Sequence, residues 1–484
     1  MLDNEGRHAR RGIVSRGPLA VVAGIIAFAL VAVILTLAAK RGRQDGVVAT
    51  IPPTPQPPPT LAAPPALPNW PRWGVTHTQF SVDNENGSAA AGGGHLLSRE
   101  PMIQNQHIMG WGVGNPEPAP GRYDFRDLDR RVKLMADTRA LPVLTLCCAP
   151  DWMKGGAEGR TNWDRIETAP LREHFDDFAD LAATIARRYP HVKHFLVWNE
   201  FKGFWNNSRN EWDAEAYTDL YNRVYDALKK VNPEIQVGGP YVPIDSHADP
   251  RHPSELRGPW GVVDQRSLDA ITYWLRHKKG ADFIVVDGSS VTSDRGIVPD
   301  EFTALGKFRA VTEWLRQRAG DLPVWWAEWY VAPDNADWDE RRRTAVQAAA
   351  MMEFAASGAQ TLLYWNPQRR PGDDCAGCLW RPGTGEEMPM AGLLSGFVRW
   401  FHAGAPLHTV PVSDDRIRVL ATDDQMVMVN TTDAPLAVDV DGRRFDLEPY
   451  EVRWSDRGGE PEDGEGGGQA EAGGPAVTGR SRAR

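Results

Sequence analysis

The sequence predicts an α/β protein: a (β/α)8 barrel, the TIM-barrel architecture, with a small C-terminal β domain, preceded by one transmembrane helix and a Pro-rich linker. Two observations predict the barrel. Short apolar runs alternate with amphipathic helical patterns over residues 70–405, which is typical of parallel strands joined by helices. Two of these runs, His194–Asn199 and Val324–Glu328, lead into carboxyl side chains, as expected where a strand leaves a barrel at its carboxyl end.

Eight strands with intervening helices can be assigned along residues 70–405. The expected strands are Trp73–Thr78, His107–Gly112, Pro142–Cys147, His194–Asn199, Ile235–Gly239, Asp282–Asp287, Val324–Glu328 and Thr361–Trp365. Apolar residues that recur at three and four positions predict helices over 171–185, 217–231, Arg126–Arg139, Gln265–Lys279, Glu301–Ala319, Glu340–Ser357 and Ala391–His402. The connection Asn84–Gln106 is rich in Gly and Ala and shows no clear amphipathic helix. Residues 241–264 are expected to form a long loop that walls the site.

The N-terminal part predicts membrane attachment. Residues 1–17 form a basic N-terminal segment, and residues 18–39 are almost wholly apolar. About 20 apolar residues cross a bilayer as a helix, whereas the apolar core of a cleaved signal peptide is usually about 7–15 residues long. The length favours an uncleaved transmembrane helix, with cleavage as the alternative. We expect a single-pass cell-membrane protein whose large domain is extracytoplasmic and whose helix makes the membrane a partner.

The remaining boundaries follow composition. Residues 40–69 form a Pro-rich linker, which is semi-rigid because proline fixes φ. Residues 70–405 form the barrel domain. Residues 406–454 contain short β-type segments separated by Asp, Asn and Gly, which predicts a small β domain. Residues 455–484 consist mainly of Gly, Glu and Ala, bury too little apolar surface to fold, and are expected to be disordered.

The bulk composition limits the classes of partner. The chain has 484 residues and a formal net charge of −10. Because the globular part carries no basic stripe, we do not expect nucleic acid as a partner. We expect no metal and no other cofactor, and the oligomeric state is left open.

Two acidic residues at strand ends indicate a particular chemistry. Glu200 follows the fourth expected strand and Glu328 ends the seventh. Cleavage of an O-glycosidic bond needs one carboxyl group to protonate the leaving oxygen and a second to attack the anomeric carbon or activate water. A separation of about 5–5.5 Å gives retention of configuration, and about 6.5–9.5 Å gives inversion. A poly- or oligosaccharide is therefore the expected substrate.

Three motifs carry a resemblance to a known family. They are Trp198-Asn199-Glu200 after an apolar strand, Ala327-Glu328-Trp329 near the seventh strand, and Gly121-Arg122-Tyr123-Asp124-Phe125 after the second. Over roughly residues 70–405 the chain resembles the retaining (β/α)8 glycoside hydrolases of clan A. The nearest family is glycoside hydrolase family 39, the β-xylosidase/α-iduronidase family.

The resemblance implies roles for four residues. Glu200 would be the general acid/base and Glu328 the nucleophile of a double displacement. Asn199 would hydrogen-bond the sugar 2-hydroxyl next to the cleaved bond, and Trp365 would form the hydrophobic floor beneath that sugar. The identity of the sugar stays open among pentosides, hexosides and uronides, as do exo or endo action and hydrolysis or transglycosylation.

The chain departs from the family pattern at two places. Phe201 follows Trp-Asn-Glu, where many relatives have proline. The sixth strand offers Asp287, where relatives often carry a His or Tyr that contacts the nucleophile. A carboxylate beside Glu328 would raise the pKa of that glutamate, which suits an acid better than a nucleophile.

Further substrate-binding candidates lie at or just after strand carboxyl ends, where the C–H faces of a sugar could stack on aromatic rings. They are His77, Trp111, Trp152, Trp205, Trp329 and Trp365. Each tryptophan is also compatible with a place in the core or a lid, and His77 is equally compatible with a structural role.

The four cysteines form two close pairs. Cys375 and Cys378 belong to one CxxC motif with no second pair, which does not suit zinc. In an extracellular setting a local disulfide is favoured. Cys147 and Cys148 are adjacent on the third expected strand, and we expect both to be reduced and buried.

Two other classes of function compete with a glycosidase. One is a catalytically weak carbohydrate-binding barrel at the cell surface, and the other is a structural surface protein. Both leave the pairing of Glu200 with Glu328 unexplained.

Overall fold

The computed structural model describes residues 72–331 and 336–457. The predicted basic segment, transmembrane helix and linker, and the predicted tail beyond residue 457, lie outside the described residues. Within the described part, every helix is too short or too polar to be a membrane span.

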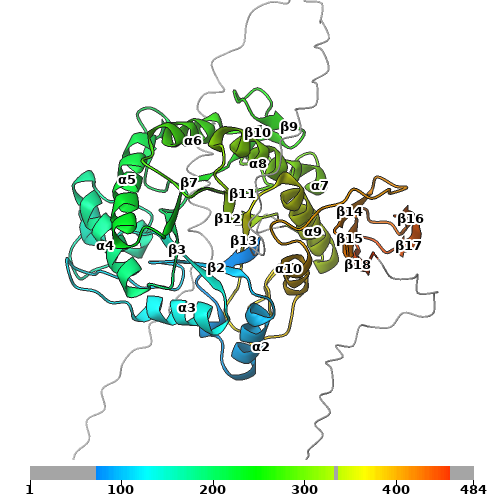
Figure 1. Cartoon of the computed structure of the whole chain (residues 1–484), viewed down its shortest axis with the longest axis horizontal. Helices are drawn as coiled ribbons and strands as arrows, with labels where there is room; N and C mark the ends of the chain where they lie inside the picture. Colours follow the sequence, from blue (N-terminus) through cyan, green and yellow to red (C-terminus); the bar gives the residue numbers. More distant parts are fainter. Residues whose placement is uncertain (1–71, 332–335, 458–484) are drawn as a thin grey trace, which may run out of the picture. The chain divides into compact units, whose positions relative to one another are not determined.

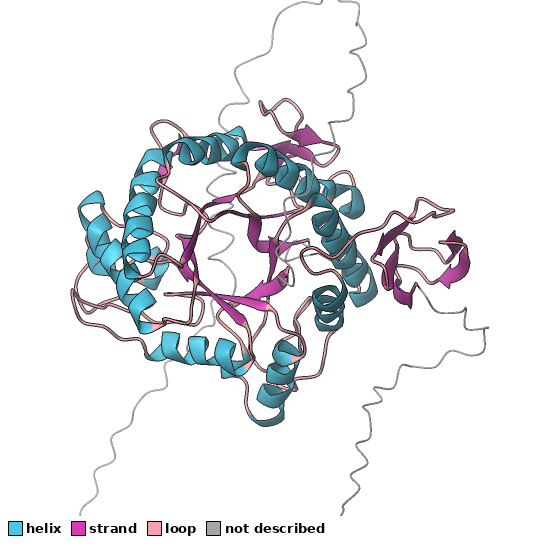
Figure 2. Ribbon diagram, viewed as in Figure 1, coloured by secondary structure: helices cyan, strands magenta, loops and turns pink. Residues whose placement is uncertain are grey.

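Eight parallel strands close into a barrel, as predicted, and Figures 1 and 2 show them as a ring enclosed by helices. Around the barrel the order is β1-β2-β3-β4-β7-β11-β12-β13, and β13 pairs with β1. The strands are β1 (Trp73–Thr76), β2 (Ile103–His107), β3 (Leu141–Leu146), β4 (His194–Val197), β7 (Gln236–Pro243), β11 (Phe283–Ser289), β12 (Val324–Tyr330) and β13 (Thr361–Trp365).

Apart from the first, the helices of the outer ring follow the predicted patterns, and the predicted helix Glu301–Ala319 is divided into two. They are α2 (Gly87–Ser98), α3 (Arg126–Asp137), α4 (Phe175–Arg188), α5 (Ala214–Val231), α6 (Gln265–His277), α7 (Glu301–Ala304), α8 (Gly306–Ala319), α9 (Glu340–Ser357) and α10 (Pro389–Trp400). Aspartates begin several of them, because a carboxylate satisfies a free N–H group of the first turn. Asp213 accepts from the backbone N–H of Ala216 at the start of α5, and Asp339 does the same for Arg342 in α9.

The first connection corrects two expectations. The second strand is Ile103–His107 and ends where the sequence pattern placed its beginning. Its polar residues are buried because they find partners inside the barrel: Asn105 donates to Thr76 Oγ1 (3.1 Å) and accepts from Thr145 Oγ1 (2.9 Å). The Gly-rich segment before it is helix α2. A Cβ atom at Gly92 would lie 2.5 Å from the carbonyl oxygen of Gly385, so this helix packs too closely for a larger residue.

The side chains of β12 are divided between two cores: they alternate from Trp325 to Ala327, and a register irregularity between Trp326 and Trp329 then places Trp329 on the same side as Trp326. Trp325 and Ala327 belong to the cluster inside the barrel, whereas Trp326 and Trp329 belong to the cluster between barrel and helices. The Trp325 ring stacks on Phe283 with centroids 3.9 Å apart. A continuous apolar run therefore suits this strand, because both of its faces are buried.

Replacing Trp325 by alanine is expected to lower the free energy of unfolding by about 3–5 kcal/mol, the usual cost of removing a large aromatic side chain from a packed core. Trp325 is 1% exposed, whereas Trp163 is 50% exposed, so Trp163→Ala is the control and should stay within about 0.5 kcal/mol of the wild type. Urea unfolding followed by circular dichroism measures both. Similar losses for the two variants would show that the barrel interior does not depend on this ring.

Two insertions rise from the carboxyl end of the barrel. After β4 the chain forms a short hairpin of β5 (Trp205–Asn206) and β6 (Glu211–Trp212). The expected long loop 241–264 instead begins inside β7 and contains a three-stranded antiparallel sheet of β8 (Ser246–His247), β9 (Arg257–Gly258) and β10 (Gly261–Val263). The Pro- and Asp-rich sequence hid these very short strands.

The C-terminal β region consists of two small sheets. One joins β14 (Ile417–Ala421), β15 (Gln425–Asn430) and β18 (Val452–Asp456), and the other pairs β16 (Leu436–Val440) with β17 (Arg443–Leu447). The sequence patterns missed β17, whose alternating charged residues face solvent. Trp454 packs its ring against Phe397 of α10, with centroids 5.6 Å apart, so this region is anchored on the helical layer.

The cysteines form two disulfides, and no described cysteine is free. The predicted Cys375–Cys378 staple is confirmed. The expectation that Cys147 and Cys148 are reduced is wrong, because these neighbours are bonded to each other. Successive side chains of a strand point to opposite faces, but β3 ends at Leu146, so the pair lies beyond the strand and its sulfur atoms meet. Both residues are buried, as expected.

Candidate active site

Three carboxyl groups from three neighbouring segments meet at the carboxyl end of the barrel. Glu200 follows β4, Asp287 lies in β11 and Glu328 lies in β12. One oxygen from each lies within 4.8 Å of the others. We call these three residues the carboxylate cluster. The fold thus brings together the two glutamates that the sequence singled out, and it adds the aspartate of the sixth barrel strand.

The backbone that presents Glu200 is unusual. Trp198, Glu200 and Phe201 have φ values of +68°, +47° and +50°, and each such residue costs on the order of 1–3 kcal/mol. Surrounding contacts hold the turn: Trp198 Nε1 donates to the carbonyl of Lys202 at 2.7 Å, and the Phe201 ring stacks on Tyr217 at 4.1 Å. Such strain persists where packing over-determines it, which is common at functional sites.

Two residues that the sequence patterns missed contact Glu328. Tyr241 Oη, from β7, donates to Glu328 Oε1 at 2.6 Å. His107 Nε2, at the end of β2, lies 3.8 Å from the same oxygen, and apart from an interaction with Asn199 neither ring nitrogen of this buried histidine has a hydrogen-bond partner among the described residues. The sixth strand offers Asp287, as the sequence showed, and the tyrosine that contacts Glu328 comes instead from the fifth barrel strand. The His107 ring stacks on Trp111 at 4.1 Å.

In the favoured state of the carboxylate cluster, fewer negative charges are present than its three carboxyl groups could carry. Burial, together with the charge of Glu200, raises the pKa of Glu328 to about 8, and the Tyr241 hydrogen bond opposes this only in part. Burial and Glu200 also raise the pKa of Asp287 well above its usual range. Burial acts on Glu200 in the same direction, but Lys202, whose Nζ lies 2.5 Å from Glu200 Oε2, helps bring its pKa below the ordinary value. The resting site thus favours an ionised Glu200 beside protonated neighbours.

Three other predicted site residues lie at this end of the barrel. Asn199 is 1% exposed, and apart from an interaction with His107 its Oδ1 has no hydrogen-bond partner among the described residues. Trp111 is connected to the site by two contacts. Its ring stacks on His107, and Lys202 Nζ lies 5.7 Å from the centre of the ring. Trp365 ends β13, next to β12, and is half-buried.

Four predicted residues are engaged elsewhere. The two ring nitrogens of His77 face Gln104 Oε1 and Ser81 Oγ, each at 3.0 Å. Trp329 is fully buried against Phe354 of α9, so no ring face is free for a sugar. Trp152 donates to the carbonyl of Glu117, and Trp205 packs on Trp212 in the β5–β6 hairpin. For His77 and Trp329 the structural or core alternative fits the packing better, whereas the partly buried rings of Trp152 and Trp205 stay predicted sugar-binding residues.

The carboxylate cluster also has the oxygen ligands that a hard cation accepts. Burial and the charge of Glu200 raise the pKa of both Asp287 and Glu328, which favours their protonated forms, whereas a cation needs ionised ligands. That the site works without a metal stays a prediction.

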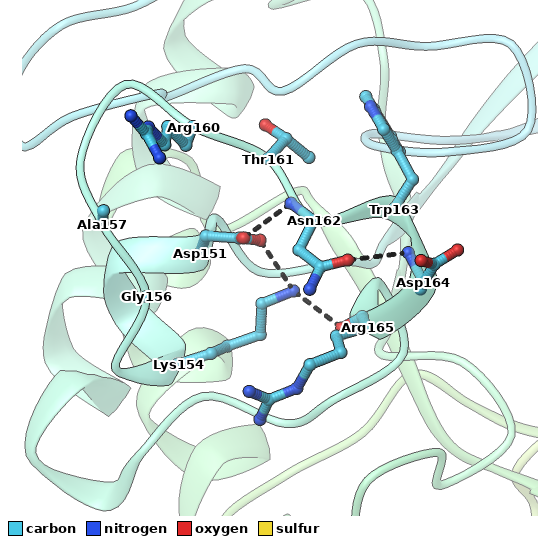
Figure 3. Close-up of a pocket in the computed structure, with 10 residues that line it drawn as sticks. All are labelled: Asp151, Lys154, Gly156, Ala157, Arg160, Thr161, Asn162, Trp163, Asp164 and Arg165. Carbon is cyan, nitrogen blue, oxygen red and sulfur yellow. Dashed lines mark hydrogen bonds and ion pairs between the residues drawn. The ribbon is translucent and has the colours of Figure 1, made fainter.

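A separate cavity of about 590 Å³ lies in the loop between β3 and α4 (Figure 3). It is lined by residues of the segment 151–165 and by no member of the carboxylate cluster. The same loop supplies Glu167, whose Oε1 accepts from Lys202 Nζ at 2.6 Å. The loop that holds the cavity is therefore joined to the carboxylate cluster by the ion pairs of Lys202 with Glu167 and Glu200.

Replacing Lys202 by methionine is expected to move both limbs of the pH–rate profile to higher pH. Lys202 lowers the pKa of Glu200 and also that of Glu328, and removing a cation favours the protonated form of each carboxyl group. The measurement is kcat/KM against pH. Lys133→Met removes a lysine paired with Asp137 on the exposed face of α3 and should leave the profile unchanged. An unshifted profile in Lys202→Met would show that this lysine does not pair with Glu200 in solution.

Solved structures support the barrel fold. The chain is similar to a monomeric beta-xylosidase from Caulobacter crescentus CB15, with 16% identity, coverage of 76% of this chain and 74% of that chain, and a TM-score of 0.51. A GH39 enzyme from Xanthomonas axonopodis pv. citri gives 16% identity, coverage of 76% and 73%, and a TM-score of 0.52. SrfJ from Salmonella typhimurium gives 12% identity, coverage of 80% and 90%, and a TM-score of 0.54.

Family models are more specific than these distant structural likenesses. Among curated proteins, none matches the chain. The model of the D-apionate lactonase C-terminal immunoglobulin-like domain matches residues 414–455, in the small β region. The model of glycosyl hydrolases family 39 matches residues 117–366, which is more than half of the chain and includes the whole carboxylate cluster. The resemblance read from the strand-end motifs is thereby confirmed: the chain belongs to glycosyl hydrolases family 39 and is a glycosidase.

Proposed function

We propose that this glycoside hydrolase retains the configuration of the anomeric carbon by double displacement. The observation that carries the proposal is the short separation in the carboxylate cluster, where oxygens of Glu200 and Glu328 lie within 4.8 Å of each other. Inverting enzymes need about 6.5–9.5 Å to admit a water molecule between the carboxyl groups, whereas retaining enzymes use about 5–5.5 Å.

In the proposed reaction Glu328 attacks the anomeric carbon while Glu200 gives its proton to the leaving oxygen. The bond from the anomeric carbon to that oxygen breaks, and a glycosyl ester forms on Glu328. Water then attacks the anomeric carbon of this ester, Glu200 takes a proton from the water, and the bond from the anomeric carbon to Glu328 breaks to release the carboxylate. Tyr241 holds the attacking oxygen from the side through its 2.6 Å hydrogen bond.

The reaction requires a proton on Glu200 and a charge on Glu328, which is the reverse of the arrangement favoured at rest. The two groups share protons, so their titrations belong to the pair. The reactive form, with the proton on Glu200 and the negative charge on Glu328, is then a minor protonation state of the pair. Lys202 disfavours it, because its ammonium group stabilises the charge on Glu200.

We propose that the sugar is bound by site residues whose polar atoms have few hydrogen-bond partners or whose ring is only half-buried. Apart from an interaction with each other, Asn199 Oδ1 and the ring nitrogens of His107 are buried without hydrogen-bond partners among the described residues, and a buried polar group without a partner costs about 1–3 kcal/mol. Sugar hydroxyl groups would satisfy them. The half-buried Trp365 is proposed as the floor beneath the sugar.

The test of retention follows the product directly. The full-length protein is offered a panel of aryl β-glycosides, beginning with the β-xyloside, and proton NMR records which anomer appears before mutarotation. A β-anomer formed first supports double displacement and names the accepted sugar. An α-anomer formed first would reject the retaining mechanism.

We also propose that residues 18–39 anchor the protein in the cell membrane, with the barrel extracytoplasmic. Two disulfides in the described part suit an oxidising compartment. A reporter fused after residue 46 tests the orientation. A signal from the cytoplasmic side would reject it.

A further inference from the structure

The cavity in the loop between β3 and α4 lies on one particular side of the carboxylate cluster. β3 pairs with β4, the strand that leads into Glu200. The loop then packs directly on the turn after Glu200: a Cβ atom at Gly203 would lie 2.2 Å from the backbone nitrogen of Ala169. The Glu167–Lys202 ion pair joins the same two segments at 2.6 Å. The cavity therefore stands on the Glu200 side of the site.

The floor of the cavity is rigid and polar. Asp151 is 8% exposed, its Oδ2 accepts from the backbone N–H of Asn162 at 2.6 Å, and its Oδ1 makes no hydrogen bond among the described residues. Lys154 Nζ lies 3.4 Å from that Oδ1 and donates to the carbonyl of Arg165 at 3.1 Å. Figure 3 shows these side chains converging between the two arms of the loop. The Asp151–Lys154 ion pair therefore gives the cavity a polar, largely buried floor.

The rim carries exposed groups with free binding capacity. Within residues 72–331 and 336–457, the guanidinium groups of Arg160 and Arg165 form no hydrogen bond or ion pair. In Figure 3 they lie on opposite sides of the Asp151–Lys154 pair. The carboxylate of Asp164 is the opposing charge on this rim, so two cations face one anion. Trp163 is 50% exposed, and an exposed indole ring offers a face to the C–H groups of a sugar.

These groups select a class of ligand. An indole face and two guanidinium groups around one polar cavity suit a sugar ring that carries a negative charge, because guanidinium binds carboxylate and other oxyanions with paired hydrogen bonds. A general acid protonates the oxygen of the leaving group, so the Glu200 side of the site receives the part of the substrate that departs.

We propose that this cavity binds an anionic sugar unit on the leaving-group side of the scissile bond, so that the natural substrate is an acidic polysaccharide cut within its chain. The inference rests on the proposed function, which assigns the acid role to Glu200. A carboxylate group and a sulfate ester group on the sugar both carry a negative charge, and the experiment distinguishes between them.

The test measures binding by calorimetry in the Glu328→Gln background, which prevents turnover. The probes are tetragalacturonate, a sulfated carrageenan tetrasaccharide and neutral xylotetraose. We expect one anionic probe to bind about tenfold more tightly than xylotetraose, and the double variant Arg160→Gln/Arg165→Gln to lose that gain. Trp163→Ala should weaken all three. Arg444→Gln, which removes an exposed cation from β17, is the matched control and should keep the gain.

The outcomes separate this inference from the proposed function. Whichever anionic probe shows the gain identifies the charged group. Equal affinity for anionic and neutral probes, or a gain that survives in the double variant, would overturn the inference. Turnover of aryl β-glycosides by the wild-type protein is recorded separately. If no turnover is found but the anionic probe still binds more tightly than the neutral one, the result counts against the proposed function and supports the role of the cavity in binding an anionic sugar.

Discussion

Replacing Glu328 by glutamine is expected to lower kcat for aryl β-glycosides on the order of 10⁴–10⁶-fold, the range seen when a covalent nucleophile is removed. Glutamine keeps the shape of the side chain, and its amide oxygen can still accept the hydrogen bond from Tyr241. The amide cannot attack the anomeric carbon, so the glycosyl ester does not form. Steady-state release of the chromophore measures the loss.

The fold should tolerate this change. The pKa of Glu328 is raised to about 8 by burial, so its protonated form is favoured in the folded protein and the stability it contributes is lost as the pH rises through about 8. A neutral amide is therefore not expected to reduce the thermal midpoint at pH 7. Glu215→Gln, on the exposed face of α5, is the matched control and should retain full activity. Undiminished turnover by Glu328→Gln would overturn the assignment of the nucleophile.

Replacing Glu200 by glutamine is expected to produce a loss that depends on the leaving group. A positioned general acid contributes about 10²–10⁴-fold, and this whole factor should be lost for poor leaving groups such as a second sugar. Dinitrophenyl leaving groups depart without a proton, so the first step should then be nearly normal. Lys202 keeps its 2.6 Å contact with Glu167 in this variant, so its charge stays paired and the turn remains folded.

The decisive comparison is the slope of log(kcat/KM) against the pKa of the leaving phenol. A steep slope in Glu200→Gln beside a shallow slope in the wild type supports proton donation by Glu200. Added azide should restore turnover in this variant, because a small anion can replace the water that has lost its general base. Equal losses for good and poor leaving groups would reject the acid role and leave Glu200 as a binding group.

Strong periodic patterns predicted the architecture well. The predicted strand Thr361–Trp365 and helix Glu340–Ser357 coincide with β13 and α9, because the strand is a short apolar run and the helix is rich in alanine and ends before Gly358. The second strand was misplaced because Gln104, Asn105 and Gln106 look like loop residues. Their burial depends on partners such as Thr76 and Thr145, which only the closed barrel supplies.

The sequence predicted the acidic residues of the candidate site but missed the residues that contact them. Glu200 and Glu328 were found because each ends an apolar strand, which is a local signal. Tyr241 follows Gly-Pro at the fifth strand and carried no comparable signal, although a tyrosine at a strand end could have been tested against the acids. The disulfide of Cys147 with Cys148 was missed for the same reason, since it depends on the path of the chain after β3.

Local sequence thus set which residues stand at the carboxyl ends of the strands, because the period of a strand and the apolar run before each acid are properties of consecutive residues. Which acids meet, how closely, and which of them keeps a proton were decided by barrel closure. Burial, the 2.5 Å contact of Lys202 with Glu200 and the 2.6 Å hydrogen bond from Tyr241 to Glu328 act between residues far apart in the chain or on a strained turn. Distances of that kind determine electrostatic energies, and they exist only in the folded protein.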